Sequence, residues 1–257
     1  MTYIKVVEKN EQKKENMSTN KVNILAIGAH PDDVELGCAG TLLAHHAKGL
    51  RSAIVDLTRG ELGTRGSVDE RKAEAANAAK ILGVTQRINL EFRDGFFAND
   101  EEHQREVIKA IRYFQPDIIL CNAVYDRHPD HGRAAALVRE AAFLSGLSKI
   151  KTQWESHTQE PHRPKAVYHY IQALDVKADF AVDISSFFDT KMEAIRAFTS
   201  QFYDPNSKEA NTFISSPEFL DFVQARASNF GTQIGVRYAE GFSANRLIGT
   251  ESLLSLL

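Results

Sequence analysis

The sequence predicts an α/β domain built on a mostly parallel, Rossmann-like sheet with helices on both faces. Three observations lead to this prediction. Short apolar runs rich in β-branched residues, typical of strands buried on both faces, recur along the chain. They alternate with helix-like segments to about residue 145, which indicates βαβ units with right-handed crossovers. Polar clusters follow two of the runs directly, at the edge where open α/β sheets bind ligands.

The first predicted strand is the apolar run 22–27, which is ended by Gly28 and followed by a helix at 36–47. Between strand and helix lie the ionisable residues His30, Asp32, Asp33 and Glu35. Imidazole nitrogen and carboxylate oxygen are both good zinc ligands. Because neighbouring side chains on a turn point in different directions, one aspartate can bind a metal while the other faces a water. The cluster is equally consistent with a loop whose acids cap the following helix.

The next elements are expected in chain order as a strand at 52–57, a glycine-rich loop at 58–66, a helix at 67–82, a strand at 87–92 and a helix at 101–114. Gly83 is placed to end the first of these helices, and the Gln115-Pro116 pair ends the second. The glycine-rich loop, TRGELGTRG, lacks the GxGxxG spacing of a dinucleotide-binding turn.

A second polar cluster follows the predicted strand 117–122, in the sequence AVYDRHPDH, and a helix is expected at 132–144. A catalytic zinc site typically has three protein ligands and an open position for water. His30 and Asp33 from the first turn, with His131 from the second, supply two imidazoles and a carboxylate. His128 and Asp130 then lie beside the metal. Two such clusters at equivalent strand ends favour a metal site over a purely structural role.

These motifs carry a family resemblance. AHPDD followed by HPDH resembles the zinc-dependent PIG-L/LmbE-like N-acetylglucosamine deacetylases, over a stretch from about residue 22 to beyond residue 183. AHPDDVELG, TRGELGTRG, HPDH and HRPKAVYHYIQ are most similar to the bacillithiol biosynthesis deacetylases, which remove acetyl from N-acetylglucosaminyl malate. Many relatives have HPDDE where this chain has Val34 before Glu35, which leaves the role of Glu35 open.

The resemblance implies a zinc-dependent amide hydrolase, and Fe²⁺ also suits two histidines and a carboxylate. In the expected mechanism Asp32 is the general base and His128 stabilises the oxyanion, while Asp130 orients His128 or a ligand imidazole. Arg65 takes the substrate-binding role of the matching family arginine. Asp94 is read either as an acceptor for sugar hydroxyls or as an ordinary turn aspartate before glycine.

Substrate and assembly are less closely defined. Arg59, Arg65 and Arg127 are available to meet the two carboxylates of malate. Free N-acetylglucosamine, chitobiose or another acetylated glycoconjugate are alternative substrates, and a non-catalytic zinc or nucleotide-binding module is an alternative of another class. The family resemblance implies a homo-oligomer, either trimer or hexamer.

After residue 147 the alternating pattern weakens. We expect a long loop at 149–164, strands at 166–172 and 180–184, helices capped by Ser185 and Ser216, and an extended segment at 235–242. His169 lies in a strand pattern from which it could approach the site. Nothing in this part indicates a second domain, so residues 21–257 are predicted to form one domain.

Composition excludes several classes of protein. A net charge of −3 gives no general attraction to nucleic acid or anionic membranes, and no apolar run approaches the roughly 20 residues of a membrane span. Cys38 and Cys121 are far apart in the sequence and are expected to be free thiols in a reducing cytoplasm. Residues 1–20 are polar, lack a signal-peptide core and are expected to be a mobile tail, so that Met17 could be the true start.

Overall fold

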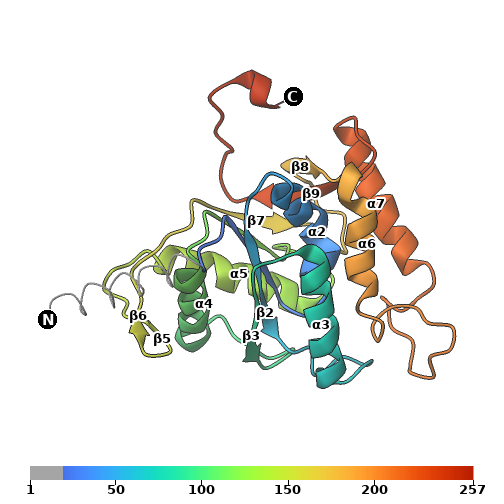
Figure 1. Cartoon of the computed structure of the whole chain (residues 1–257), viewed down its shortest axis with the longest axis horizontal. Helices are drawn as coiled ribbons and strands as arrows, with labels where there is room; N and C mark the ends of the chain where they lie inside the picture. Colours follow the sequence, from blue (N-terminus) through green and yellow to red (C-terminus); the bar gives the residue numbers. More distant parts are fainter. Residues whose placement is uncertain (1–19, 257) are drawn as a thin grey trace, which may run out of the picture.

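The computed structural model describes residues 20–256 and contains a seven-stranded sheet with the strand order β3-β2-β1-β4-β7-β9-β8 (Figure 1). In chain order these strands are β1 (Ile24–Gly28), β2 (Ser52–Thr58), β3 (Arg87–Phe92), β4 (Ile118–Cys121), β7 (Ala166–Tyr170), β8 (Phe180–Asp183) and β9 (Ala239–Ala244). The neighbouring strands β3, β2, β1, β4 and β7 pair in parallel, whereas β9 is antiparallel to both β7 and β8. The predicted α/β architecture is therefore confirmed.

The strand order reverses between β1 and β4. The chain runs outward from β1 to β2 and β3, then returns to place β4 on the other side of β1. Ile24 to Ile27 pair in register with Ile118 to Cys121. In open α/β sheets, ligands bind beyond the carboxyl ends of the strands at this kind of reversal. The two polar clusters of the sequence follow these two strands.

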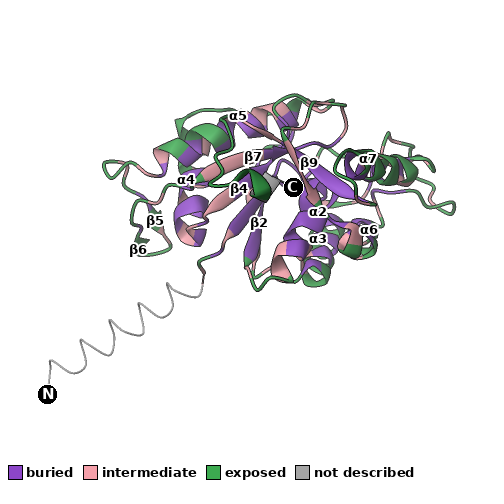
Figure 2. Cartoon of the chain, turned by 90° about the horizontal axis from the view of Figure 1, so that it is seen from above, coloured by how far each residue is buried: buried purple, intermediate pink, exposed green. Residues whose placement is uncertain are grey.

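Helices cover both faces of the sheet, as the sequence predicted. On one face α4 (Glu101–Phe114) and α5 (Pro129–Leu144) pack against side chains such as Leu25, Val55 and Ile119. The other face carries α2 (Asp33–His46), α3 (Val68–Leu82), α6 (Phe188–Arg196) and α7 (Phe219–Gln233). Figure 2 shows the buried residues along the sheet and the exposed residues on the outer faces of the helices.

Local signals explain the ends of several helices. Ser67 and Glu70 form a capping box at the start of α3, and Gly83 ends that helix with a φ of 65°. The helix after HPDH begins at Pro129 rather than at residue 132, because His128 is its N-cap. The expected caps Ser185 and Ser216 are wrong: α6 follows a 3₁₀ turn, η1 (Ser185–Phe187), and α7 is capped by Glu218.

Close packing places α2 directly against β7. A Cβ atom on Gly37 would lie 2.2 Å from the ring of Tyr170, so no larger residue fits there without movement. The Tyr170 hydroxyl donates to the carbonyl of Ile27, at 3.0 Å, and so also joins β7 to β1. The N-terminal end of α2, which begins at Asp33, is thereby held at the end of β1.

The remaining elements are short. The expected loop 149–164 contains a hairpin of β5 (Gln153–Trp154) and β6 (His157–Thr158), and a 3₁₀ turn, η2 (Leu253–Leu256), lies near the C-terminus. Cys38 and Cys121 are buried free thiols, as predicted. None of the helices in residues 20–256 is long and apolar enough to cross a membrane. The expected tail and the alternative start at Met17 lie in residues 1–19, outside the described part.

Candidate metal centre and substrate cavity

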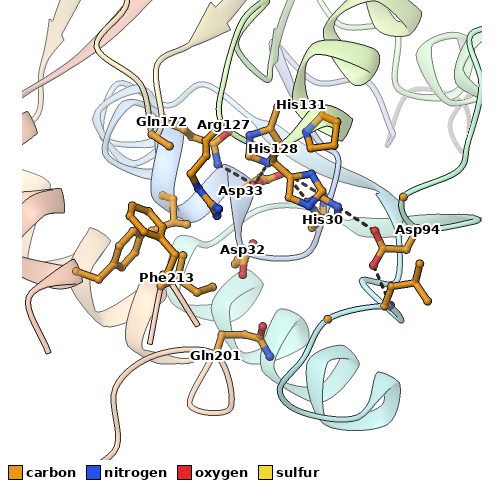
Figure 3. A pocket seen from close by; sticks show the side chains of 18 of the residues that line it. His30, Asp32, Asp33, Asp94, Arg127, His128, His131, Gln172, Gln201 and Phe213 are labelled. Atoms are coloured by element: carbon orange, nitrogen blue, oxygen red, sulfur yellow. Dashed lines mark hydrogen bonds and ion pairs between the residues drawn. The ribbon is translucent and has the colours of Figure 1, made fainter. Parts of the chain in front are cut away.

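The turns after β1 and β4 meet at one end of a cavity of about 390 Å³. Figure 3 shows His30 and Asp33 from the first turn beside His128 and His131 from the second. The structure thus brings together the residues in which the sequence predicted a metal site. We refer to His30, Asp32, Asp33, Asp94 and His131 as the acidic end of the cavity, all of which line it.

Asp33 is the most densely bonded carboxylate at the acidic end. Oδ2 accepts from the backbone N of His30 at 3.0 Å and from Asn122 at 2.9 Å, and Oδ1 accepts from Gln172 at 2.7 Å. Oδ1 also lies 3.2 Å from Nε2 of His131. Burial alone would raise the pKa of Asp33, but His131 and His30 hold it well below its usual range. Asp33 is therefore fixed in position as an anion.

His131 directs its Nε2 atom at Asp33. Its Nδ1 lies 2.6 Å from Asp126 Oδ2 and donates to that carboxylate, which leaves the Nε2 lone pair directed at Asp33. A lone pair and a carboxylate oxygen at this distance require a proton or a metal cation between them. Despite burial, Asp33 and Asp126 raise the pKa of His131 to about 9, so in the metal-free protein a proton occupies Nε2, and a metal cation would take its place. The donor set therefore fits a divalent cation.

His30 completes the proposed set of ligands. Nδ1 lies 3.5 Å from Asp33 Oδ2, and Nε2 lies 3.1 Å from Asp94 Oδ1 and 3.4 Å from Asp130 Oδ2. Burial alone would lower the pKa of His30, but these carboxylates raise it well above its usual value. Carboxylates that accept from the far nitrogen of a metal-binding imidazole orient the ring and raise its basicity. Asp94 and Asp130 are placed to do this for His30.

A second set of donors overlaps the first. Ring nitrogens of His30, His128 and His131 lie within 4.8 Å of one another, so three imidazoles could also hold a cation. His128 is the N-cap of α5, and its Nδ1 accepts from the backbone N of Asp130 at 3.2 Å. Nε2 of the neutral ring then carries the proton and is a donor. Burial, with His30 and His131, lowers the pKa of His128 and favours this neutral form.

The Asp130 carboxylate contacts the ring of His30 rather than that of His128. Its Oδ2 accepts from the backbone N of Gly95 at 2.8 Å, and its Oδ1 accepts from Arg133. Of the two alternatives from the sequence, the contact with His30 is present, whereas His128 receives only the backbone N–H of Asp130. The role of Asp130 stays a prediction, now directed at His30.

Asp32 lines the cavity beside the proposed ligands and has an unusual backbone. Its φ of 118° lies in a region that favours glycine and typically costs about 1–3 kcal/mol. Arg71 donates to its Oδ2 at 3.2 Å and to the carbonyl of Pro31 at 2.6 Å. Burial raises the pKa of Asp32 to about 7, while Arg71 acts in the opposite direction. Asp32 is thus held by Arg71, whereas Asp33 is held by Asn122 and Gln172.

The other candidate residues from the sequence lie in different surroundings. Arg65 donates to Glu209 at 3.5 Å and is not among the residues that line the cavity, so its substrate role stays a prediction. Asp94 lines the cavity but also accepts from the backbone N of Leu62 at 2.9 Å. Glu35 is buried in an ion pair with Arg87, at 2.6 Å. His169 is buried outside the cavity, where its Nδ1 donates to the carbonyl of Asn122.

The opposite side of the cavity is made by the C-terminal third of the chain, and Arg127, which comes from the same turn as His128, reaches towards it. Figure 3 shows Phe213 and Gln201 across the cavity from the histidines. The Arg127 guanidinium lies 4.4 Å from the centre of the Phe213 ring. Phe219, whose ring centre lies 5.5 Å from that of Phe213, and Arg226 are both on α7 and also line the cavity. We call Arg127, Phe213, Phe219 and Arg226 the cationic wall.

Sequence reasoning missed three of these residues. Asp126 holds His131, Arg71 holds Asp32, and Arg226 is part of the cationic wall. Asp126 could have been found, because it lies in the same polar run as His131. Arg71 and Arg226 lie in predicted helices, where charged residues usually face solvent, and no local pattern distinguishes them.

Comparisons with known proteins agree on one family. A family model described as PIG-L, GlcNAc-PI de-N-acetylase, matches residues 25–142. The chain is 31% identical over 228 residues to diacetylchitobiose deacetylase of Thermococcus kodakarensis, covering 85% of this chain and 81% of that protein. It is 26% identical over 196 residues to probable N-acetyl-alpha-D-glucosaminyl L-malate deacetylase 2 of Bacillus anthracis, with 71% and 83% covered. The crystal structure of a conserved protein from Thermus thermophilus aligns with a TM-score of 0.79 and 35% identity, over 90% of this chain and 99% of that one.

Proposed function

The chain belongs to the PIG-L family of GlcNAc-PI de-N-acetylases, and we propose that it deacetylates N-acetylglucosaminyl malate. Family membership makes it a hydrolase of N-acetyl amide bonds in sugar conjugates, which confirms the resemblance seen in the sequence. The observation that carries the proposed reaction is the pairing of Asp33 with His30 and His131 at the end of a cavity that Asp32 also lines.

His30, Asp33 and His131 would hold the metal ion, with Zn²⁺ as the proposed metal and Fe²⁺ as the alternative. When bound, such an ion supplies a Lewis acid that lowers the pKa of water towards about 7 and polarises the amide carbonyl. Asp126 and Asp94 orient His131 and His30 through their far nitrogens. The protein thereby holds the proposed ligands in place before substrate arrives.

Asp32 takes a proton from the attacking water as general base, and the water oxygen bonds to the acetyl carbon. His128 donates from Nε2 to the oxygen that gains negative charge in the tetrahedral intermediate. The C–N bond then breaks, the amine leaves with a proton from Asp32 or His128, and acetate and a free glucosamine amine are formed. Arg71 fixes the orientation of the Asp32 carboxylate for the first step.

The two relatives described above differ in the substrate for which they are named. One is named for N-acetyl-alpha-D-glucosaminyl L-malate and the other, with higher identity, for diacetylchitobiose. The malate conjugate is proposed because the quoted motifs most resemble those of bacillithiol biosynthesis enzymes and because the cationic wall offers two arginines to an acidic group. Chitobiose is the alternative. A cytoplasmic location and a trimeric or hexameric assembly stay predictions.

The test is release of free amine from three substrates, N-acetylglucosaminyl malate, N,N'-diacetylchitobiose and free N-acetylglucosamine. Each reaction is run with the metal-loaded protein, with a chelator, and with zinc or Fe²⁺ restored after chelation. We expect chelator-sensitive turnover with a clear preference for the malate conjugate. A preference for diacetylchitobiose would replace the substrate, and undiminished turnover in chelator would refute the metal-dependent mechanism.

A further inference from the structure

The cationic wall depends on a break in α2. Cys38 has φ −147° and ψ 15°, which are not helical angles, so hydrogen bonds that a continuous helix would make are missing there. The backbone N–H groups of Gly40 and Thr41 donate instead to Glu240, at 3.0 and 2.7 Å. The carbonyl of Leu36 accepts from Lys191 at 3.0 Å and from Arg226 at 3.1 Å. Charged side chains from α6, α7 and β9 therefore fill the break.

Only some of these charges are balanced. Lys191 and Glu240 form a buried ion pair at 2.5 Å. Arg226 lies beside them and is partly buried, yet no carboxylate of the described residues is within ion-pair distance of its guanidinium. A guanidinium has five N–H donors, and in residues 20–256 the Arg226 side chain donates to Leu36 O alone. Burial lowers the pKa of Arg226 to about 10, while the charges of Glu240 and Asp126 act in the opposite direction, and the guanidinium stays charged at neutral pH.

The arginines that line the cavity also differ in whether a carboxylate pairs with them. Arg71 is paired with Asp32, whereas Arg127 and Arg226 line the cavity with no carboxylate partner in the described part of the chain. Arg127 packs on Phe213, and Arg226 lies with its guanidinium 5.3 Å from the centre of the Phe222 ring. Arg127 is exposed, whereas Arg226 is partly buried and has no ion-pair partner among the described residues. A partly desolvated guanidinium of this kind gains from a bound anion. A neutral disaccharide brings no such charge.

We infer that Arg226 is a specificity-determining residue, whose guanidinium binds an anionic group on the aglycone of the substrate while Leu36 O holds its other edge. The inference rests on the proposed function and deepens it, because it explains how an acidic conjugate is selected over a neutral one. Planar guanidinium binds carboxylate or phosphate in the same bidentate manner, so either group has the required chemistry. The malate conjugate offers carboxylates.

The kinetic test compares Arg226→Gln and Arg226→Lys with the unchanged protein on the malate conjugate and on N,N'-diacetylchitobiose. Loss of a charged hydrogen bond predicts that Arg226→Gln raises KM for the malate conjugate about 10- to 100-fold, with kcat changed by less than about threefold. Arg226→Lys keeps the positive charge but loses the planar guanidinium that binds a carboxylate through two N–H groups. Its KM for the malate conjugate should therefore lie between those of the unchanged protein and Arg226→Gln. KM for diacetylchitobiose should stay within about twofold.

Arg196→Gln is the matched control, because Arg196 is an exposed arginine at the end of α6. Its kinetic constants should equal those of the unchanged protein for both substrates. An equal loss on both substrates in Arg226→Gln would make Arg226 a structural residue and overturn the inference. No change on the malate conjugate would overturn it as well.

A binding measurement separates this inference from the proposed function. L-malate and inorganic phosphate are titrated separately into the metal-loaded protein and its Arg226→Gln and Arg226→Lys variants by calorimetry. Because the metal is common to all samples, weaker binding in Arg226→Gln, partly restored in Arg226→Lys, supports the inference even if neither sugar is deacetylated. An Arg226-dependent response to phosphate alone would identify phosphate as the anion. Equal affinities in all three proteins would overturn the inference.

Discussion

The acidic end of the cavity is densely hydrogen-bonded, whereas the cationic wall makes few polar contacts. The Asp33 carboxylate accepts three hydrogen bonds, and His30 and His131 each have a carboxylate on the nitrogen opposite Asp33. In the cationic wall, Arg127 packs on an aromatic ring and Arg226 bonds to Leu36 O. The difference indicates that the acidic end holds groups in place for chemistry. The opposite wall leaves its donors available for substrate.

The largest effect should come from removing Asp33. Asp33→Ala should lower the bound metal to near zero and reduce turnover by more than the roughly 10- to 100-fold typical of changes beyond the ligands. Elemental analysis and the amine-release assay measure the two effects. His128→Ala is the comparison: it should keep its metal while losing activity. Metal retained in Asp33→Ala and lost in His128→Ala would show that the three imidazoles are the ligands instead.

Asp32→Asn tests whether chemistry and metal binding are separate within the acidic end. Asparagine has nearly the same shape but cannot take the proton, so kcat should fall by about 10²- to 10⁴-fold. Metal content should be unchanged, because Asp32 is not among the proposed ligands. A kcat within about threefold of the unchanged protein would remove Asp32 from the role of general base.

Lys191→Ala tests the support of the cationic wall. Removing one partner of a buried ion pair typically costs about 3–5 kcal/mol, because Glu240 would be left as an uncompensated buried charge. Chemical denaturation measures the free energy of unfolding. Lys72→Ala, at an exposed position on α3, should change it by less than about 0.5 kcal/mol.

The same variant also tests how far the two ends are independent. Since Lys191 contacts Leu36 O but none of the proposed ligands, Lys191→Ala should keep full metal content in the folded protein. Loss of metal under conditions where the variant is folded would contradict a division of the cavity into two separately supported regions.

The smallest expected effect concerns Asp126. Asp126→Asn keeps an acceptor for the His131 Nδ1–H but removes its charge, so metal affinity should fall about 10- to 100-fold. Competition with a chelator of known affinity measures this. Asp221→Asn, on the exposed first turn of α7, serves as the control and should bind metal like the unchanged protein.

Much of the parallel part of the sheet could be predicted from the sequence. The strand β2 agrees within a residue with its apolar run, because a strand buried on both faces needs a largely apolar stretch. The edge strand β3 has the predicted bounds although it is only partly buried. The starts of α6 and α7 were predicted less well. Ser185 and Ser216 resemble helix caps locally, but packing of Phe188 and Phe219 into the core decides where those helices begin.

The sequence by itself determined the residues of the acidic end. His30, Asp33 and His131 follow directly after β1 and β4, and parallel strands that pair as neighbours bring their carboxyl ends together. Only the tertiary structure decided their partners: Asp126 for His131, Arg71 for Asp32, and Asp94 and Asp130 for His30. It alone also placed Arg226 in the cavity. That position depends on the break in α2 and on packing between segments almost 200 residues apart, which no local pattern encodes.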